Sequence, residues 1–168
     1  MDSAPARAAT NGATAVRAGS VTLAQAGAAP ATRTTAKAAT ALSKAARQRA
    51  RAAKAVSAAR RKVGAPYRWG GTGPGAFDCS GLAQYSWRKA GVRLPRISHS
   101  QYRAVRKKVS WRGLRPGDLL FFYGKGHVGI YVGKGRMVHA PSSGRTVRVV
   151  KLKGYYRSAF AGAVRPGG

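Results

Sequence analysis

Residues 75–82 read GAFDCSGL and contain the only cysteine of the chain. The residues that follow, Ser80 to Ala90, carry apolar or small side chains at helical spacing and predict a helix. Asp78 is placed to cap its start, and Gly91 to end it in the left-handed conformation. Cys79 therefore falls at a helix start, where unpaired N–H groups and the helix dipole favour a thiolate of low pKa. This placement predicts a nucleophile; the alternative is a small buried core residue.

The balance of charged residues excludes several kinds of site. The 168 residues include 32 lysines and arginines but only three acidic residues, for a formal net charge of +29. There is no glutamate, and the aspartates are Asp2, Asp78 and Asp118. A two-carboxylate glycosidase needs a tuned pair of acids, and an octahedral metal site needs several oxygen ligands. We therefore expect neither of these sites, no bound metal and no cofactor.

The excess of positive charge predicts an anionic partner. A nucleic acid, an acidic membrane surface and an anionic cell-wall polymer all satisfy it, and non-specific binding to polyanions is expected. A single cysteine permits no intramolecular disulfide and so does not indicate a compartment. The sequence has no apolar run of about 18 residues, so we expect no integral membrane association. We expect a monomer.

The composition changes near residue 53 and predicts two parts. Residues 1–53 are rich in Ala and Thr, lack aromatic residues, and are predicted to form a basic tail that is largely disordered or partly helical. Within it, the uncharged residues 18–31 end in Ala29-Pro30-Ala31, which resembles a small-residue cleavage site. This segment is a weak export signal, and a plain linker is the alternative.

The end of the tail is predicted to be helical and to contact the domain that follows. Helix-forming residues dominate from residue 35 to residue 62, with many lysines and arginines among them. The last turns, residues 53–63, are expected to pack through Val56, Ala59 and Val63. The alternative is a basic tail that coats nucleic acid.

Residues 54–168 are predicted to form one compact α+β domain. After the helix near residues 80–90, a second short helical segment is expected, with Ser98 as its cap. Because the helices precede the strands, the expected architecture has N-terminal helices packed on a central antiparallel β-sheet. Strands are predicted at residues 119–122, 127–132, 136–140, 146–151 and 156–164.

Two histidines are predicted to share one face of this sheet. His127 and His139 lie in strands that flank residues 133–135, which we expect to form a three-residue hairpin loop. That register puts His139 opposite Gly129, two residues from His127, so both side chains point to the same face. A two-residue loop would put them on opposite faces.

A cysteine at a helix start and two histidines on one face are the components of a Cys–His–His triad. The base activates the nucleophile, and the third group orients the base. A zinc ion held by Cys79, His127 and His139 is one alternative, although close-spaced ligand pairs are absent. A pair of purely structural histidines is the other. His99 lies in a polar Ser-His-Ser stretch and is expected at the surface.

Six short motifs follow one another in the second part of the chain. They are PYRWGG (66–71), FDCSGL (77–82), PRISHSQ (95–101), PGDLLFF (116–122), HVGIYVG (127–133) and HAP (139–141). In this order they strongly resemble the NlpC/P60 family of papain-like cysteine peptidases, which cut the stem peptides of peptidoglycan. The resemblance covers about residues 54–166 and departs from the family at Ile97, where threonine is more common.

The resemblance implies a role for each matching residue. Cys79 corresponds to the nucleophile, His127 to the general base and His139 to the orienting residue. The residues implied in binding substrate are Tyr67, Trp69, Asp78, Ser80 and Ser98.

The resemblance also implies a papain-like NlpC/P60 fold and a peptidoglycan hydrolase. The implied reaction cuts the amide between a D-γ-glutamyl residue and a diamino acid through a thioacyl-enzyme. It implies stem peptides and anionic wall polymers as partners, and an extracellular or cell-envelope location in a bacterium. The alternatives are an amidase or acyltransferase on the same fold, a wall-binding module with an inactive site, and a nucleic-acid-binding protein.

Overall fold

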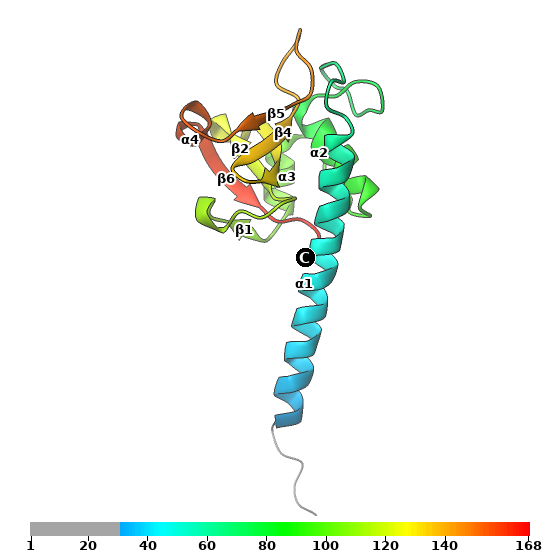
Figure 1. Ribbon diagram of the computed structural model, residues 1–168, viewed down its shortest axis with the longest axis vertical. Helices are drawn as coiled ribbons and strands as arrows, with labels where there is room; N and C mark the ends of the chain where they lie inside the picture. The colour runs from blue at the N-terminus through cyan, green and yellow to red at the C-terminus, as the bar shows by residue number, and fades with distance from the viewer. Residues whose placement is uncertain (1–30) are drawn as a thin grey trace, which may run out of the picture.

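The structure is a computed structural model that describes residues 31–168, with side chains from residue 37 onward. A long helix lies along one side of a body built from one sheet and several shorter helices (Figure 1). The cleavage-site-like segment and most of the predicted tail lie outside the described residues. The helices and strands are α1 (Ala31–Arg60), α2 (Cys79–Lys89), α3 (Ser98–Ala104), β1 (Lys108–Val109), β2 (Leu119–Phe122), β3 (His127–Gly133), β4 (Arg136–His139), β5 (Arg148–Lys151), α4 (Tyr155–Ser158) and β6 (Phe160–Val164).

The strands form one antiparallel sheet in the order β1-β6-β2-β3-β4-β5. Helices α1 and α2 cover one face of this sheet, where Trp87, Phe121 and Ile130 are fully buried. A smaller cluster fills the other face around Phe122 and Met137 and includes residues of α4. Successive side chains along a strand point to opposite faces of the sheet, so the apolar residues of the strands contribute to both clusters. The predicted α+β architecture is therefore confirmed.

Helix α2 begins where the sequence predicts, because Asp78 caps it. The Asp78 Oδ1 atom accepts a hydrogen bond from the Gly81 N–H at 2.7 Å. At the other end, Gly91 has the positive φ of 76° that is expected of the residue after the helix. The buried face of α2, which includes Leu82 and Trp87, packs on the sheet and fixes the position of the first turn.

The β3–β4 hairpin has the predicted face pattern, but the predicted three-residue loop is wrong. Lys134 and Gly135 form a two-residue turn with φ of 51° and 62°, a backbone that suits the twist of a hairpin. The register then shifts by one residue between Tyr131 and Gly133. This irregularity compensates for the shorter loop. The strands that carry His127 and His139, β3 and β4, therefore keep the predicted register.

Two other local predictions are wrong. The single strand predicted at residues 156–164 is not formed, because α4 occupies the first part and only Phe160–Val164 is extended. The N–H groups of Arg157 and Ser158 bond to the Gly154 carbonyl and wind this segment into a helical turn. Ser98 is the first residue of α3 rather than its cap; the extended residue before it, Ile97, is the cap and makes no side-chain capping bond.

Helix α1 continues through the predicted boundary between residues 53 and 54. It already bonds to the body at Gln48, whose Nε2 donates to the Pro166 carbonyl at 3.1 Å. Ala52 packs so closely against Gly117 that a Cβ at residue 117 would lie 2.6 Å from the Ala52 Cβ. The packing therefore starts earlier than predicted.

At the end of α1, the predicted packing residues behave differently from one another. Ala59 is buried and Val56 contacts the core, as expected. Val63 is 46% exposed, contrary to the prediction, because the helix ends at Arg60 and Val63 lies in the turn beyond it. Neither α1 nor any other described helix has an apolar stretch long enough to cross a bilayer.

Candidate active site

Cys79 is the first residue of α2, and its side chain is only partly accessible. The backbone N–H groups of Val128, Ser80 and Cys79 itself lie near its sulfur and favour the charged thiolate. Val128 directly follows His127, at the start of β3. The start of a helix and the start of a strand therefore bring the predicted nucleophile next to the predicted base.

Burial controls the protonation of this thiol. Burial raises the pKa of the Cys79 thiol and the nearby Asp78 carboxylate raises it further, while the backbone N–H groups lower it without reversing the effect. The low thiol pKa expected at a helix start is therefore wrong for the resting protein. Desolvation of a thiolate costs more than the three N–H groups return. At neutral pH, Cys79 is a thiol that needs a base.

His127 and His139 form a directly bonded pair. The His127 Nε2 atom lies 2.8 Å from the His139 Nδ1 atom, and the two rings are nearly perpendicular at 83°. Burial lowers the pKa of His127 to about 4. Burial, together with the charges of His127 and Arg148, lowers the pKa of His139 to about 3. Both rings are therefore neutral at pH 7. Because His127 uses Nε2 in its contact with His139, its Nδ1 atom remains available to accept the thiol proton.

Tyr156 extends this pair by one more residue. Its hydroxyl oxygen lies 3.4 Å from the His139 Nε2 atom, and the two rings meet edge to face. Burial raises the pKa of Tyr156, so the phenol is neutral. The sequence did not reveal this contact, because its pattern assigns residue 156 to a strand; the aromatic pair Tyr155-Tyr156 is its only signal.

On the other side of Cys79, Asp78 is held by an arginine. Arg96 Nη1 lies 3.1 Å from Asp78 Oδ1 and 2.9 Å from the Ser80 Oγ, and Arg96 Nη2 forms an ion pair with Asp78 Oδ2. Asp78 also accepts from the Gly70 and Gly81 N–H groups. Its oxygens are thus fully engaged within the protein. The sequence contains Arg96 in a motif, but its role as the partner of Asp78 was missed.

Burial acts on Asp78 against these bonds. Desolvation works to raise the pKa of Asp78, but the hydrogen bond from Arg96 and those from Gly81 and Gly70 outweigh it and lower the pKa below its usual value. The carboxylate is therefore charged at neutral pH. It ties the loop before the nucleophile to the first turn of α2.

The remaining predicted residues lie at different distances from this centre. Tyr67 is beside the nucleophile: burial raises its pKa, and the charges of Cys79 and Asp78 raise it further. Trp69 is 86% exposed in the loop that Asp78 holds through Gly70. Ser98 is buried at the start of α3, and no contact described for it reaches Asp78 or Ser80. His99 is exposed, as expected.

The three residues of the proposed triad do not form a ligand set for a metal. Within residues 31–168, no three His, Cys, Asp or Glu side chains are grouped so that they could hold an ion. His127 and His139 turn ring nitrogens toward each other. This arrangement can move a proton along a line of hydrogen bonds.

The sequence model of the NlpC/P60 family matches residues 64–165. The chain belongs to the NlpC/P60 family. It is 50% identical over 88 residues to the probable endopeptidase p60 of Listeria monocytogenes, a match that covers 51% of this chain and 18% of that protein. It is 47% identical over 92 residues to a probable endopeptidase of Mycobacterium tuberculosis, covering 54% of this chain and 24% of the relative.

Solved NlpC/P60 structures confirm the predicted fold. An NlpC/P60 family protein from Bacillus cereus superposes with a TM-score of 0.64 at 36% identity, over 68% of this chain and 39% of that one. The NlpC/p60 domain of the peptidoglycan hydrolase SagA superposes with a TM-score of 0.60 at 35% identity, over 67% of this chain and 97% of that domain. The chain spans no more than a quarter of either curated relative, so their shared part is the NlpC/P60 domain.

Proposed function

We propose that this NlpC/P60 chain is a cysteine endopeptidase that cuts amide bonds in the stem peptides of peptidoglycan. The observation that carries the proposal is the 2.8 Å contact between His127 Nε2 and His139 Nδ1, beside a cysteine at a helix start. The relatives supply the reaction class, because two are named endopeptidases and SagA is named a peptidoglycan hydrolase.

The mechanism begins from a neutral thiol and a neutral imidazole. As the Cys79 sulfur attacks the substrate carbonyl carbon, the thiol proton passes to Nδ1 of His127. The His127 Nε2–H then donates to His139 Nδ1, which steadies the imidazolium. The N–H groups near the sulfur are placed to stabilise the oxyanion that forms on the carbonyl oxygen.

Collapse of the tetrahedral intermediate breaks the amide C–N bond. His127 returns its proton to the leaving amine, and the acyl group remains on sulfur as a thioester. Water then adds to the thioester carbon with His127 as base, and the acid and the free thiol are released. Each cycle consumes one water and yields one amine and one carboxylic acid.

We propose the bond between the D-γ-glutamyl residue and the diamino acid as the one cut, following the resemblance of the motifs around Cys79, His127 and His139. A peptidoglycan substrate also places the protein outside the cytoplasm, in the cell envelope. Asp78, Ser80, Arg96 and Tyr67 would border the acyl half of the substrate.

Mass spectrometry of muropeptides tests this function directly. Purified stem peptides incubated with the protein should yield a fragment that ends in free D-glutamate and a second fragment with a new amino terminus on the diamino acid. The Cys79→Ala variant should give no product while its fold, followed by circular dichroism, is kept. Product from Cys79→Ala, or a different cut with the wild type, would refute the proposed reaction.

A further inference from the structure

A second concave surface lies away from the active site, between α1 and the end of the chain. It encloses about 630 Å³, and none of its lining residues belongs to the triad or to the Asp78 cluster. We call it the α1 groove. Its six exposed basic side chains are Lys44, Arg49, Arg93, Arg106, Lys107 and Arg115.

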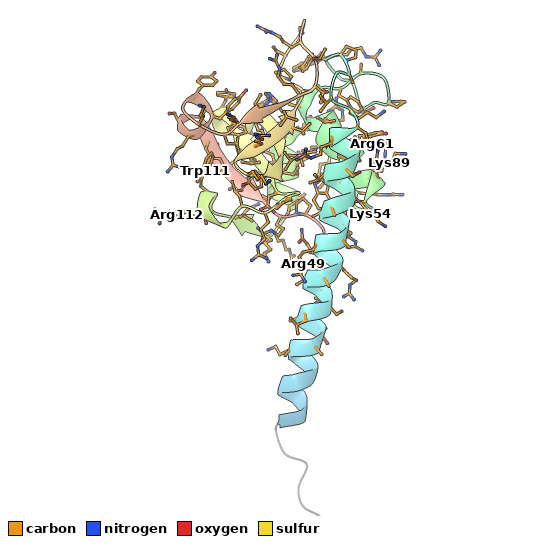
Figure 2. All side chains as sticks on the ribbon, in the orientation of Figure 1. Arg49, Lys54, Arg61, Lys89, Trp111 and Arg112 are labelled. Atoms are coloured by element: carbon orange, nitrogen blue, oxygen red, sulfur yellow. The ribbon has the colours of Figure 1, made fainter. Side chains whose placement is uncertain are left out.

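The walls of the α1 groove are fixed rather than loose. Gln48 donates to the Pro166 carbonyl at 3.1 Å, and Arg51 donates to the Gly167 carbonyl at 3.4 Å. These bonds join α1 to the C-terminal segment on one side of the groove. Figure 2 shows Arg49 on α1 at the level where the helix passes the body. Several of its lining residues are apolar, and Ala45 and Leu94 are among them.

No acidic side chain compensates these charges. Among the described residues the side-chain carboxylates are Asp78 and Asp118, and each is already paired. The terminal carboxylate of Gly168 also lines the groove and offsets one of its positive charges. Arg165, the seventh basic residue of the groove, is buried and bonds to both Asp118 oxygens at 2.8 Å. The six exposed cations therefore face solvent without an acidic side-chain partner, a placement that attracts anions.

The groove also lacks the features that nucleic acids use. None of its lining residues is aromatic, so bases would find no stacking surface. A groove lined by both cations and apolar side chains instead suits a flexible chain in which phosphates alternate with short alkyl segments.

We propose that the α1 groove binds an anionic, phosphate-bearing polyol polymer of the bacterial cell wall. The choice of this polymer rests on the proposed function, because a peptidoglycan hydrolase meets it in the same wall. Binding there holds the enzyme near its substrate without use of the catalytic residues.

Charge-matched variants of the full chain test the proposal. The groove variant carries Lys44→Gln, Arg49→Gln and Arg106→Gln. The control variant carries Arg112→Gln, Lys151→Gln and Lys153→Gln, which removes the same charge from exposed positions outside the groove. Figure 2 shows Arg112 on the opposite side of the body from α1. The probe is a fluorescent glycerol-phosphate oligomer, followed by anisotropy over a salt series.

The groove variant should bind the oligomer about ten-fold or more weakly, with a shallower salt dependence, because it neutralises fewer phosphates. The control variant should lose about three-fold or less, as expected for diffuse attraction alone. Equal losses in the two variants would overturn the proposal, because net charge alone would then explain the binding.

An oligothymidylate with the same number of phosphates separates the polymer from a nucleic acid. Tighter binding of this oligonucleotide, lost in the groove variant, would also overturn the proposal. Cleavage of a soluble stem peptide should be unchanged in both variants. Absence of cleavage by the wild type would count against the proposed function, whereas the binding results alone decide the groove.

Discussion

At the scale of single residues, the two histidines of the site have different tasks. In the proposed mechanism His127 exchanges protons with the thiol and the leaving amine, whereas the ring nitrogens of His139 contact His127 and Tyr156. We expect His127→Ala to reduce kcat by about 10²–10⁴-fold, the usual range for loss of a general acid–base. His139→Ala should lose less, and His139→Asn or His139→Gln should recover part of the rate.

Steady-state cleavage of a soluble stem peptide measures these rates. The exposed His99 provides the control, and His99→Ala should behave as wild type. If His99→Ala were the most damaging of the three alanine variants, the assignment of the triad would be wrong.

Tyr156 is expected to fix which nitrogen of His139 carries the hydrogen. For His127 to accept at Nδ1, its Nε2–H must donate to His139 Nδ1, and the hydrogen of His139 then lies on Nε2, facing the Tyr156 hydroxyl. Tyr156→Phe should lower kcat about five-fold, since a neutral hydrogen bond is worth about 1 kcal/mol. KM should not change.

The matched control is Tyr155→Phe, because Tyr155 is mostly exposed and contacts Tyr123 and the Tyr156 ring rather than His139. It should keep the wild-type kcat. A Tyr156→Phe variant that loses affinity for substrate but keeps kcat would instead make Tyr156 a substrate contact.

At the scale of elements, α1 is part of the folded body over its second half. Removal of residues 1–36 should leave the free energy of unfolding unchanged. Removal of residues 1–53 takes away the Gln48 bond to Pro166, the Arg51 bond to Gly167 and the contact of Ala52 with Gly117. We expect a loss of about 2 kcal/mol, from the two hydrogen bonds and the buried methyl groups.

Urea unfolding of the two truncated proteins gives this difference. Turnover of a soluble stem peptide below the unfolding transition should be retained in both. Equal stabilities would show that the contacts of Gln48 and Ala52 contribute nothing to folding.

Elements whose ends are set by nearby residues could be predicted from the sequence, whereas elements that depend on residues far along the chain could not. Asp78 and Gly91 mark the ends of α2 within a few residues, so the sequence was sufficient for this helix. Strand β1 has two residues and exists only because it pairs with β6. The packing of Ala52 was hidden for a related reason: alanine carries little hydrophobic signal, and its partner Gly117 lies far along the chain.

The candidate site follows the same division. Cys79, His127 and His139 were predicted from residue type and strand register, and that register is observed although the predicted loop is wrong. Arg96, in the segment before α3, and Tyr156, in α4, reach the site through long-range packing, which no local pattern encodes. The raised pKa of the Cys79 thiol likewise depends on burial by the whole domain.

At the scale of the whole molecule, the buried histidines make stability depend on pH. The folded-state pKa values of about 4 for His127 and about 3 for His139 lie below the usual 6.5. Between pH 6.5 and the folded-state pKa values, these two histidines bind protons in the unfolded chain but not in the folded chain. Stability should therefore be full above about pH 6.5 and fall as the pH drops toward 4. Each tenfold difference in proton affinity between the folded and unfolded chain changes the free energy of unfolding by roughly 1.4 kcal/mol.

Unfolding in urea at pH 7, 5.5 and 4.5 measures this loss. The double variant His127→Gln and His139→Gln should show a flatter profile, whereas His99→Gln should follow the wild type. Asp78, whose pKa is lowered, loses its contribution only at still lower pH. If the free energy of unfolding fell with pH as steeply in the double variant as in the wild type, groups other than His127 and His139 would cause the pH dependence.

The pairing of both described aspartates also bears on divalent cations. Asp78 and Asp118 are occupied by Arg96 and Arg165, so the described domain offers Mg²⁺ no free side-chain carboxylate. Magnesium in a bacterial wall would bind instead to the wall's own phosphates, where it would compete with the wall binding that we propose for the protein. Added Mg²⁺ should thus release the protein from isolated walls more effectively than NaCl at equal ionic strength, while hydrolysis of a soluble stem peptide continues unchanged. The magnesium content of the wall would then determine how much of the hydrolase stays attached to it.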